Sequence, residues 1–185
     1  MKIILASNSP RRKELLTRDG YEFEVIPSQV EEVVDNLLPP IENVKNLAKQ
    51  KCLDVAERFP DHIVIGADTI VVFEEKIFGK PKSDDEAFKM LRSLSGNIHE
   101  VMTGICVCYQ KKMINEVCVS QVVFKSMSDE DIYEYIQTKE PSDKAGAYAI
   151  QGIGKKYIEK YLGDYDNIVG LPMGMLNKIL KAFRE

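Results

Sequence analysis

Residues 2–16, KIILASNSPRRKELL, contain the pattern that decides the fold class. Ile3–Ala6 is a short apolar run that predicts a buried strand. Ser9 followed by Pro10 is typical of a helix N-terminus, and Gly20 is typical of the position just beyond a helix C-terminus. A strand that leads directly into a helix favours an α/β protein.

Two adjacent cations, Arg11 and Arg12, lie in the first turn of this predicted helix. A helix N-terminus already has free N–H groups and a partial positive charge, so exposed cations there cost about 0.3–1 kcal/mol each. An anion at this position would explain them, because the hydroxyls of Ser7 and Ser9, the amides and two guanidinium groups suit a phosphate chain. The alternative is an ordinary capped surface helix with solvated arginines.

The rest of the chain continues to alternate between strand-like and helix-like patterns. Strands are predicted at 21–28, 62–68, 99–110 and 114–127, a hairpin at 69–81 that turns at Glu74–Glu75, and helices at 41–59, 83–96, 128–140 and 171–183. Two strand-like runs are adjacent within 98–125, which breaks strict alternation and indicates a mixed sheet flanked by helices. No repeat or linker interrupts the pattern, so we expect residues 1–185 to form a single domain.

Composition limits the functional classes. With 44% hydrophobic and 29% charged residues, the 185-residue chain is typical of a globular protein. No apolar run approaches the roughly 20 residues of a membrane span, and Ile3–Ala6 is too short for an export signal, so we expect a cytoplasmic protein without membrane contact. The net charge of −4 argues against extended nucleic-acid binding but allows a small anionic ligand.

The four cysteines form no CxxC pair. Cys106 and Cys108 share one face of a predicted strand, and this pattern favours buried core thiols over a metal site. The only histidines, His62 and His99, are not beside a serine or cysteine motif, which argues against histidine–zinc chemistry and a Ser–His–Asp triad.

An aspartate lies in the apolar stretch HIVIGADTIVVF at residues 62–73. We expect Asp68 to follow the end of a buried strand, which is where α/β sheets bind ligands, and there it could bind a divalent metal or activate water. The alternative is an Asx turn at the end of that strand.

Further polar residues are dispersed along the chain. Four charged residues are, taken singly, each typical of a solvated surface charge, namely Glu31, Glu32, Lys51 and Lys80. Gln151 lies in the small-residue segment 143–154, DKAGAYAIQGIG, which is either a connecting loop or a holder for an amide that reads the edge of a base. There is no GxxxxGK[ST] loop, so the inventory of Asp, Glu, Lys and Arg suits metal-assisted phosphoryl or nucleotidyl chemistry.

Taken together, SNSPRRKELL, GADTIVV, GKP before an acidic helix, LSG, DKAGAYAIQG and NIVGLP resemble the Maf family of nucleoside triphosphate pyrophosphatases, once described as septum-formation inhibitors. The resemblance covers nearly the whole chain. It implies an α/β fold with a central mixed sheet and two lobes around a deep cleft, similar to the inosine triphosphate pyrophosphatases. Ala149 and Ser83 depart from the residues that are common in the family, Gly and Asp respectively.

The resemblance also implies residue roles. It assigns catalysis to Asp68, Glu32, Lys51 and Lys80, metal binding to Asp68 and Glu32, and substrate binding to Ser7, Ser9, Arg11, Arg12, Thr69 and Gln151. Glu31 is the alternative to Glu32 as the family's site carboxylate. Arg12, Thr69 and Gln151 match positions tied to base selection in the branch that acts on dTTP and UTP.

The implied reaction is the Mg²⁺- or Mn²⁺-dependent hydrolysis of a nucleoside triphosphate to the monophosphate and pyrophosphate. Family members are often homodimers, although no segment here identifies an interface. Two other hypotheses remain open. One is a non-enzymatic nucleotide-binding regulator of septum formation, and the other is a phosphatase that removes the terminal phosphate.

Overall fold

The structure is a computed structural model in which residues 1–183 are described, and the chain divides into two compact units. Unit 1 contains residues 1–69, 103–118 and 170–183, and unit 2 contains residues 70–102 and 119–169. Each unit therefore collects segments from separate parts of the chain.

A seven-stranded sheet has the strand order β2-β1-β3-β5-β6-β7, with β4 paired to β3. The strands are β1 (Ile3–Leu5), β2 (Phe23–Val25), β3 (Ile63–Phe73), β4 (Lys76–Phe78), β5 (Ile98–Tyr109), β6 (Lys112–Phe124) and β7 (Ile158–Leu162). Strand β1 runs parallel to β2 and β3, whereas β4 and β7 are antiparallel to their neighbours. The predicted mixed α/β sheet is thus confirmed.

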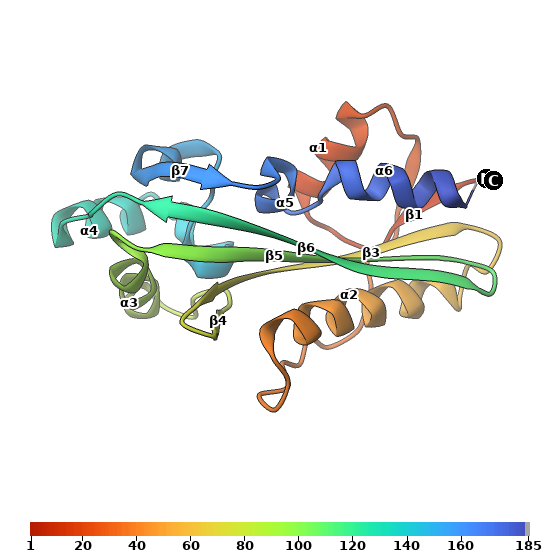
Figure 1. Ribbon diagram of the computed structural model, residues 1–185, viewed down its shortest axis with the longest axis horizontal. Coiled ribbons are helices and arrows are strands. Elements are labelled where there is room, and N and C mark those ends of the chain that lie inside the picture. The colour runs from red at the N-terminus through yellow and green to blue at the C-terminus, as the bar shows by residue number, and fades with distance from the viewer. Residues whose placement is uncertain (184–185) are drawn as a thin grey trace. The chain divides into compact units, whose positions relative to one another are not determined.

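Three of the helices belong to unit 1, namely α1 (Pro10–Arg18), α2 (Pro40–Ala56) and α6 (Met173–Ala182). Helix α2 covers one face of the strands, and α1 and α6 lie on the other (Figure 1). The core under α2 is formed by buried apolar side chains, which are Ile4, Ala6, Ala48, Cys52, Val55, Val64, Cys106 and Cys108. Burial of this apolar surface is the main term that stabilises the layer.

Two glycines allow α2 to pack unusually close to the sheet. A Cβ atom on Gly66 would lie 2.5 Å from the carbonyl oxygen of Ala48, and one on Gly104 would lie 2.5 Å from that of Val44. Real Cβ atoms do not approach backbone so closely. The sequence therefore needs glycine at both positions to bring the helix backbone against β3 and β5.

Unit 2 contains α3 (Asp84–Leu94), α4 (Asp129–Gln137) and α5 (Tyr165–Val169). Short 3₁₀ turns follow α4 at Glu140–Asp143, Ala145–Ala147 and Gly152–Tyr157. Phe88 of α3 stacks on Tyr133 of α4 with ring centroids 4.8 Å apart, which joins the two helices by an aromatic contact.

The predicted elements occur, but one boundary was wrong at an important place. Strand β3 does not end at Asp68; it continues to Phe73 before a hairpin turn. The turn residues Glu74 and Glu75 have φ angles of 49° and 65°, as a tight turn between antiparallel strands requires. Asp68 therefore lies inside a strand, and its carboxylate needs a partner in the protein rather than a turn at a strand end.

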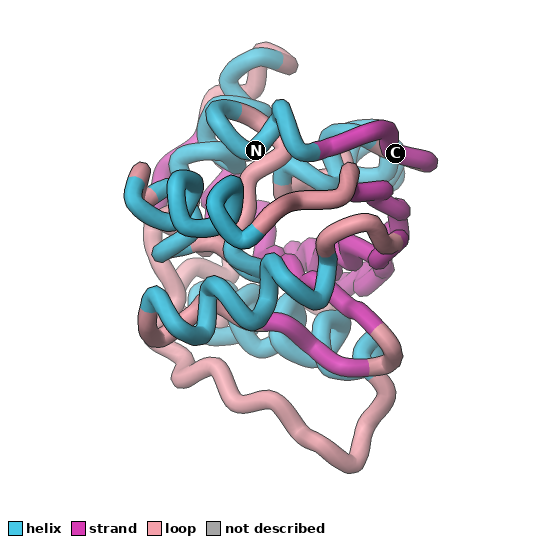
Figure 2. Tube along the Cα trace, turned by 90° about the vertical axis from the view of Figure 1, so that its left-hand side faces the viewer, coloured by secondary structure: helices cyan, strands magenta, loops and turns pink. Residues whose placement is uncertain are grey.

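Residues 26–39 connect β2 to α2 without regular secondary structure and form the long pink loop at the lower edge of Figure 2. Hydrogen bonds to the side chains of Asp54 and Asn43 on α2 fix this segment. The amide of Gln29 donates to Asp54 Oδ2 at 2.9 Å, and that of Asp35 donates to Asn43 Oδ1 at 2.8 Å. Within the described part of the chain, no helix has the length and apolar character needed to cross a membrane.

The close packing of α2 gives a stability prediction. Gly104→Ala should lower the free energy of unfolding by about 1–3 kcal/mol, because the added methyl group forces the helix away from β5. Gly79→Ala is the matched control, since a Cβ there meets nothing within 4 Å. Urea denaturation of both variants measures the difference. Equal stability of the two would show that α2 has room to move.

Candidate active site

The centre of the candidate site is an ion pair buried in unit 1. Asp68 on β3 is 6% exposed, and its Oδ1 atom lies 2.6 Å from the ammonium nitrogen of Lys51 on α2. A buried carboxylate is tolerated when it is paired and hydrogen-bonded, and removal of one partner leaves an uncompensated charge. The pairing explains how a charged residue can lie in the middle of an apolar strand.

Lys51 joins a second carboxylate to this pair. Its ammonium nitrogen lies 2.7 Å from Glu32 Oε1, and the Glu32 side chain is 58% exposed whereas that of Lys51 is 12% exposed. Glu32 lies on the 26–39 loop between Gln29 and Asp35, whose amides donate to side chains of α2. The sequence predicted Glu32, Lys51 and Asp68 as separate candidates, and the structure brings all three together.

Arg12 lies beside Asp68 in the same unit. Its Nη1 donates to Ala67 O at 3.0 Å and its Nη2 donates to Thr69 Oγ1 at 3.0 Å, so the guanidinium contacts the residues on both sides of Asp68. Nη1 also donates to Ser7 Oγ at 3.0 Å, and Nε donates to Gly170 O at 2.8 Å. Of the five N–H donors of an arginine, four are thus engaged within the protein.

The charge of Arg12 is balanced by its surroundings. Burial lowers the pKa of its guanidinium, while the negative charges of Asp68 and Glu32 raise this pKa and the positive charge of Arg11 lowers it. Because arginine remains protonated in proteins, the result is a fixed buried cation beside two carboxylates.

Arg11 differs from Arg12 in its contacts. Its Nε atom is buried and has no hydrogen-bond partner among residues 1–183. The N-cap residue of α1, Ser9, uses no side-chain hydrogen bond to cap the helix, although its amide donates to Ser7 Oγ at 3.2 Å. The first turn of α1 therefore has donor groups beyond those that the helix itself uses, and it contains no acidic residue to neutralise them.

Sequence reasoning missed three groups of this network. Thr69 Oγ1 lies 2.9 Å from Thr103 Oγ1 on β5, and the carbonyl oxygens of Ala67 and Gly170 accept from Arg12. Thr103 had a detectable signal, because it is the one hydroxyl residue in the otherwise apolar run VMTGICVC at residues 101–108. The two carbonyls had none, since any residue type supplies a backbone oxygen.

The two other predicted site residues, Lys80 and Gln151, belong to unit 2, and both are exposed. The segments that carry them are linked, because the amide of Gly146 donates to Gly79 O at 3.1 Å.

The loop after Gln151 is fixed by one carboxylate. Glu140 accepts from the amides of Ile153 at 3.0 Å and Gly154 at 2.8 Å, and from the Tyr135 hydroxyl at 2.5 Å. The segment around Gln151 is therefore a structured loop, as a side chain that reads a base would need.

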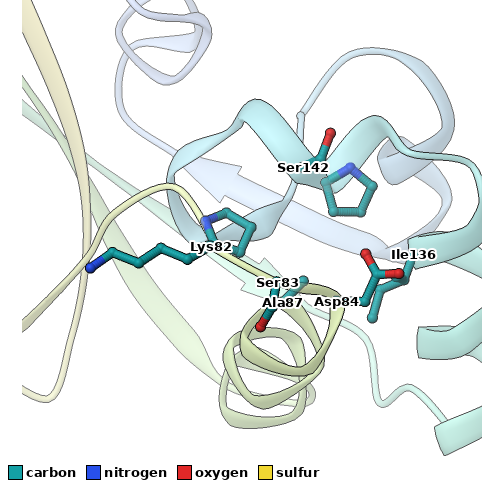
Figure 3. A pocket seen from close by; sticks show the side chains of 8 residues that line it. Lys82, Ser83, Asp84, Ala87, Ile136 and Ser142 are labelled. Carbon is teal, nitrogen blue, oxygen red and sulfur yellow. The ribbon is translucent and has the colours of Figure 1, made fainter.

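A cavity of about 240 Å³ lies wholly within unit 2, lined by residues between Pro81 and Ser142 (Figure 3). The amino group of Lys82 points away from Asp84 and Ser142 in this view. Ser83 Oγ caps α3, and Asp84 pairs with Lys139 at 3.1 Å. These polar groups already have protein partners, so the cavity has no converging cations for a phosphate chain.

A divalent cation would fit the chemistry of the carboxylates in unit 1. Asp68 and Glu32 offer oxygen ligands from two different segments, and both reach the same ammonium group. Mg²⁺ is commonly held by one or two carboxylates together with substrate phosphates, and Mn²⁺ also accepts oxygen ligands. The residues present therefore suit the expected cofactor.

A mixed sheet with Asp68 in one strand, a buried arginine and a lysine on helices, and a second carboxylate on a loop defines an α/β protein equipped to hold a phosphorylated ligand. The chain belongs to the Maf-like protein family, whose profile matches residues 2–183.

Comparison with known proteins supports the same family assignment. A protein of Bacillus cereus (strain B4264) named dTTP/UTP pyrophosphatase is 47% identical over 182 residues, which is 98% of this chain and 95% of that protein. A protein of Caldicellulosiruptor saccharolyticus with the same name is 47% identical over 97% of this chain and 94% of its own length. The Ham1 protein of Staphylococcus aureus has a similar fold, with a TM-score of 0.50 and 19% identity over 85% of this chain and 80% of that chain.

The Arg12 network gives a second stability prediction. Arg12→Lys should lower the free energy of unfolding by about 2–4 kcal/mol, because one ammonium cannot replace a planar group that donates to four acceptors. Arg18→Lys, at an exposed ion pair with Asp19, is the control and should cost less than about 1 kcal/mol. Thermal and urea unfolding measure both. An Arg12→Lys protein as stable as the unchanged protein would show that these four hydrogen bonds do not stabilise the fold.

Proposed function

We propose that this protein hydrolyses dTTP and UTP between the α and β phosphates, releasing the nucleoside monophosphate and pyrophosphate. The observation that carries the proposal is the partly buried Lys51, which contacts both Asp68 and Glu32 near the fixed guanidinium of Arg12. Binding a polyphosphate needs cations, whereas paired carboxylates next to them suit hydrolysis. The two relatives named dTTP/UTP pyrophosphatase support the choice of nucleotide.

In this proposal Asp68 orients the attacking water and accepts its proton. Lys51 holds the carboxylate of Asp68 in place through the 2.6 Å contact, and the middle of β3 provides a rigid support. Glu32 shares the same lysine, so displacement of the loop that carries it would change the charge around Asp68. Each of these roles belongs to residues of unit 1.

The proposed cofactor is Mg²⁺ or Mn²⁺, held by Asp68 and Glu32 together with phosphate oxygens. When bound, such an ion neutralises the negative charge that develops on the departing pyrophosphate. Around it, the protein supplies the oxygen ligands and the cations that flank them.

Phosphate binding is assigned to the start of α1. Arg11 has a buried Nε without a partner among the described residues, and the amides of the first helical turn point toward the same end of the helix. Ser7 and Ser9 add hydroxyl groups. Arg12 has one N–H left for substrate, so its main contribution is to position Thr69 and the backbone beside Asp68.

The family resemblance assigns the remaining contacts. Lys80 would bind phosphate oxygens, and Gln151 would read the base through its side-chain amide. We also propose that the protein acts in the cytoplasm as a homodimer on free nucleotides, without nucleic-acid partners, which agrees with a net charge of −4.

The decisive experiment is a substrate panel with product identification. The purified protein is incubated with dTTP, UTP, CTP, dATP and GTP in the presence of Mg²⁺. We expect pyrophosphate and monophosphate, with dTTP and UTP turned over fastest. Orthophosphate with a diphosphate would indicate a terminal phosphatase, and tight binding without turnover would favour a nucleotide-binding regulator.

Asp68→Asn should lower kcat by about 100- to 10,000-fold, because the amide can neither accept the proton nor carry the charge. Asp61→Asn, at an exposed aspartate, is the control and should leave kcat unchanged. Thermal unfolding of both variants shows whether they remain folded. Retained turnover in a folded Asp68→Asn protein would contradict the catalytic assignment.

Gln151→Ala should change the ratio of dTTP to GTP turnover more than it changes the dependence on Mg²⁺, because the amide acts on the base and not on the phosphates. Gln137→Ala, an exposed position at the end of α4, serves as the control. An unchanged ratio in Gln151→Ala would show that this residue does not recognise the base.

A further inference from the structure

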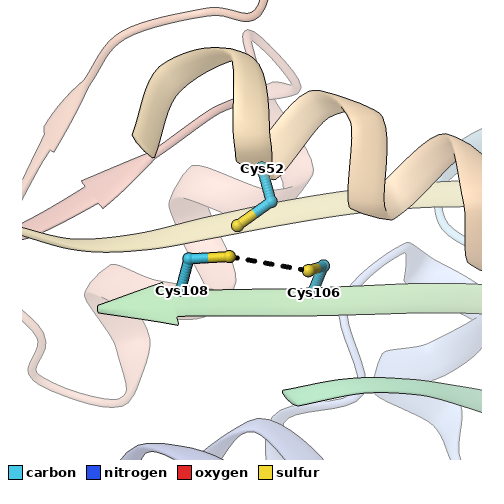
Figure 4. A group of neighbouring side chains, drawn as sticks. All are labelled: Cys52, Cys106 and Cys108. Carbon is cyan, nitrogen blue, oxygen red and sulfur yellow. Dashed lines mark hydrogen bonds between the residues drawn. The ribbon is translucent and has the colours of Figure 1, made fainter. Parts of the chain in front are cut away.

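Three of the four cysteines meet in the core of unit 1, and the proposed reaction uses none of them. The sulfur atoms of Cys52, Cys106 and Cys108 all lie within 4.8 Å of one another, and those of Cys106 and Cys108 are 3.9 Å apart (Figure 4). The three residues are 0%, 0% and 4% exposed. In Figure 4 the side chain of Cys52 points from α2 toward the two cysteines of β5.

The close packing of α2 creates this cluster. Alternation along β5 places Cys106 and Cys108 on the same face. A Cβ on Gly66 would lie 2.5 Å from the amide nitrogen of Cys52, so the absence of a side chain there lets the helix bring Cys52 down onto the strands. Cys52 now donates its S–H to Val64 O at 3.3 Å.

The sulfur separations match those of a three-coordinate thiolate site. A metal–thiolate bond is about 2.3 Å long, so three sulfurs around an ion in their plane are about 4.0 Å apart. The 3.9 Å between the Cys106 and Cys108 sulfurs is close to this value. No pair of the three sulfurs is more than 4.8 Å apart, so each sulfur would move by less than about 1 Å to reach this spacing. A disulfide would instead need the sulfurs to approach to about 2.05 Å.

The surroundings select the kind of ion. The cluster is enclosed by Ile4, Ala48, Val55 and Val64, which supply neither carboxylate nor imidazole ligands. Zinc in proteins is almost always four-coordinate and hard cations need oxygen ligands, whereas soft thiolates select Cu(I).

We propose that Cys52, Cys106 and Cys108 form a buried three-sulfur site for a soft monovalent cation of the Cu(I) type. Each cysteine that becomes a thiolate ligand releases its proton to solvent, and no electron is transferred when the ion is supplied as Cu(I).

Cys108 is the only member of the cluster with measurable exposure, which makes its side the shortest path from solvent.

The test is an anaerobic titration of the reduced full-length protein with Cu(I) against bicinchoninate as competing chelator. We expect one copper per chain to be retained, together with a higher unfolding temperature, because the ion binds the folded state. X-ray absorption of the loaded protein should show three sulfur neighbours at about 2.3 Å. Loss of all copper to the chelator, or a first shell of nitrogen and oxygen, would overturn the proposal.

Variants locate the site within the chain. Cys106→Ala and Cys108→Ala should each weaken Cu(I) binding by at least ~100-fold, since a direct ligand is lost. Cys118→Ala is the matched control, because Cys118 lies on β6 outside the cluster and should leave affinity unchanged. Equal weakening in Cys118→Ala, or tighter binding of Zn²⁺ than of Cu(I), would contradict the assignment. The copper-free unfolding temperature of each variant shows that it is folded.

Discussion

The buried guanidinium of Arg12 is the interaction on which the rest of unit 1 depends. It binds Ser7 in the loop after β1, the backbone and hydroxyl on either side of Asp68, and the carbonyl of Gly170 before α6. A buried cation is costly unless its donors are satisfied, so these segments must adopt one arrangement together. The start of α1, strand β3 and the segment at Gly170 are thereby held in fixed positions around Asp68.

The position of Asp68 in the middle of β3 follows from this arrangement. Its carboxylate pairs with the ammonium of Lys51 and interacts electrostatically with the buried guanidinium of Arg12, so two cations balance a charge that would be costly in an apolar strand. Such a site is preorganised, because the strand and helix hold the groups before any ligand arrives. The more exposed Glu32 is carried by a loop and is the member with most freedom.

Helix α2 connects two chemically different places. Lys51 faces the carboxylates while its neighbour Cys52 faces the apolar core and the thiols of β5. Both contacts depend on the same close approach, which Gly66 and Gly104 permit. A ligand at the thiols would therefore act on the helix that supplies the lysine of the candidate active site.

Local sequence determined the elements of this protein, because strands and helices arise from periodicity, capping and turn residues that are close in the chain. Ile3–Leu5, the start of α1 at Pro10 and the hairpin at Glu74–Glu75 were all predictable in this way. The spaced motifs also determined the Maf-like family, which the comparisons confirm. Only the tertiary structure decided that Arg12 is buried rather than solvated, that Lys51 joins Asp68 to Glu32, and that Cys52 meets Cys106 and Cys108. These contacts join residues that are far apart in the chain. Some of the hydrogen-bond acceptors are backbone oxygens, which every residue type supplies, so the sequence does not identify them and only folding brings the groups together.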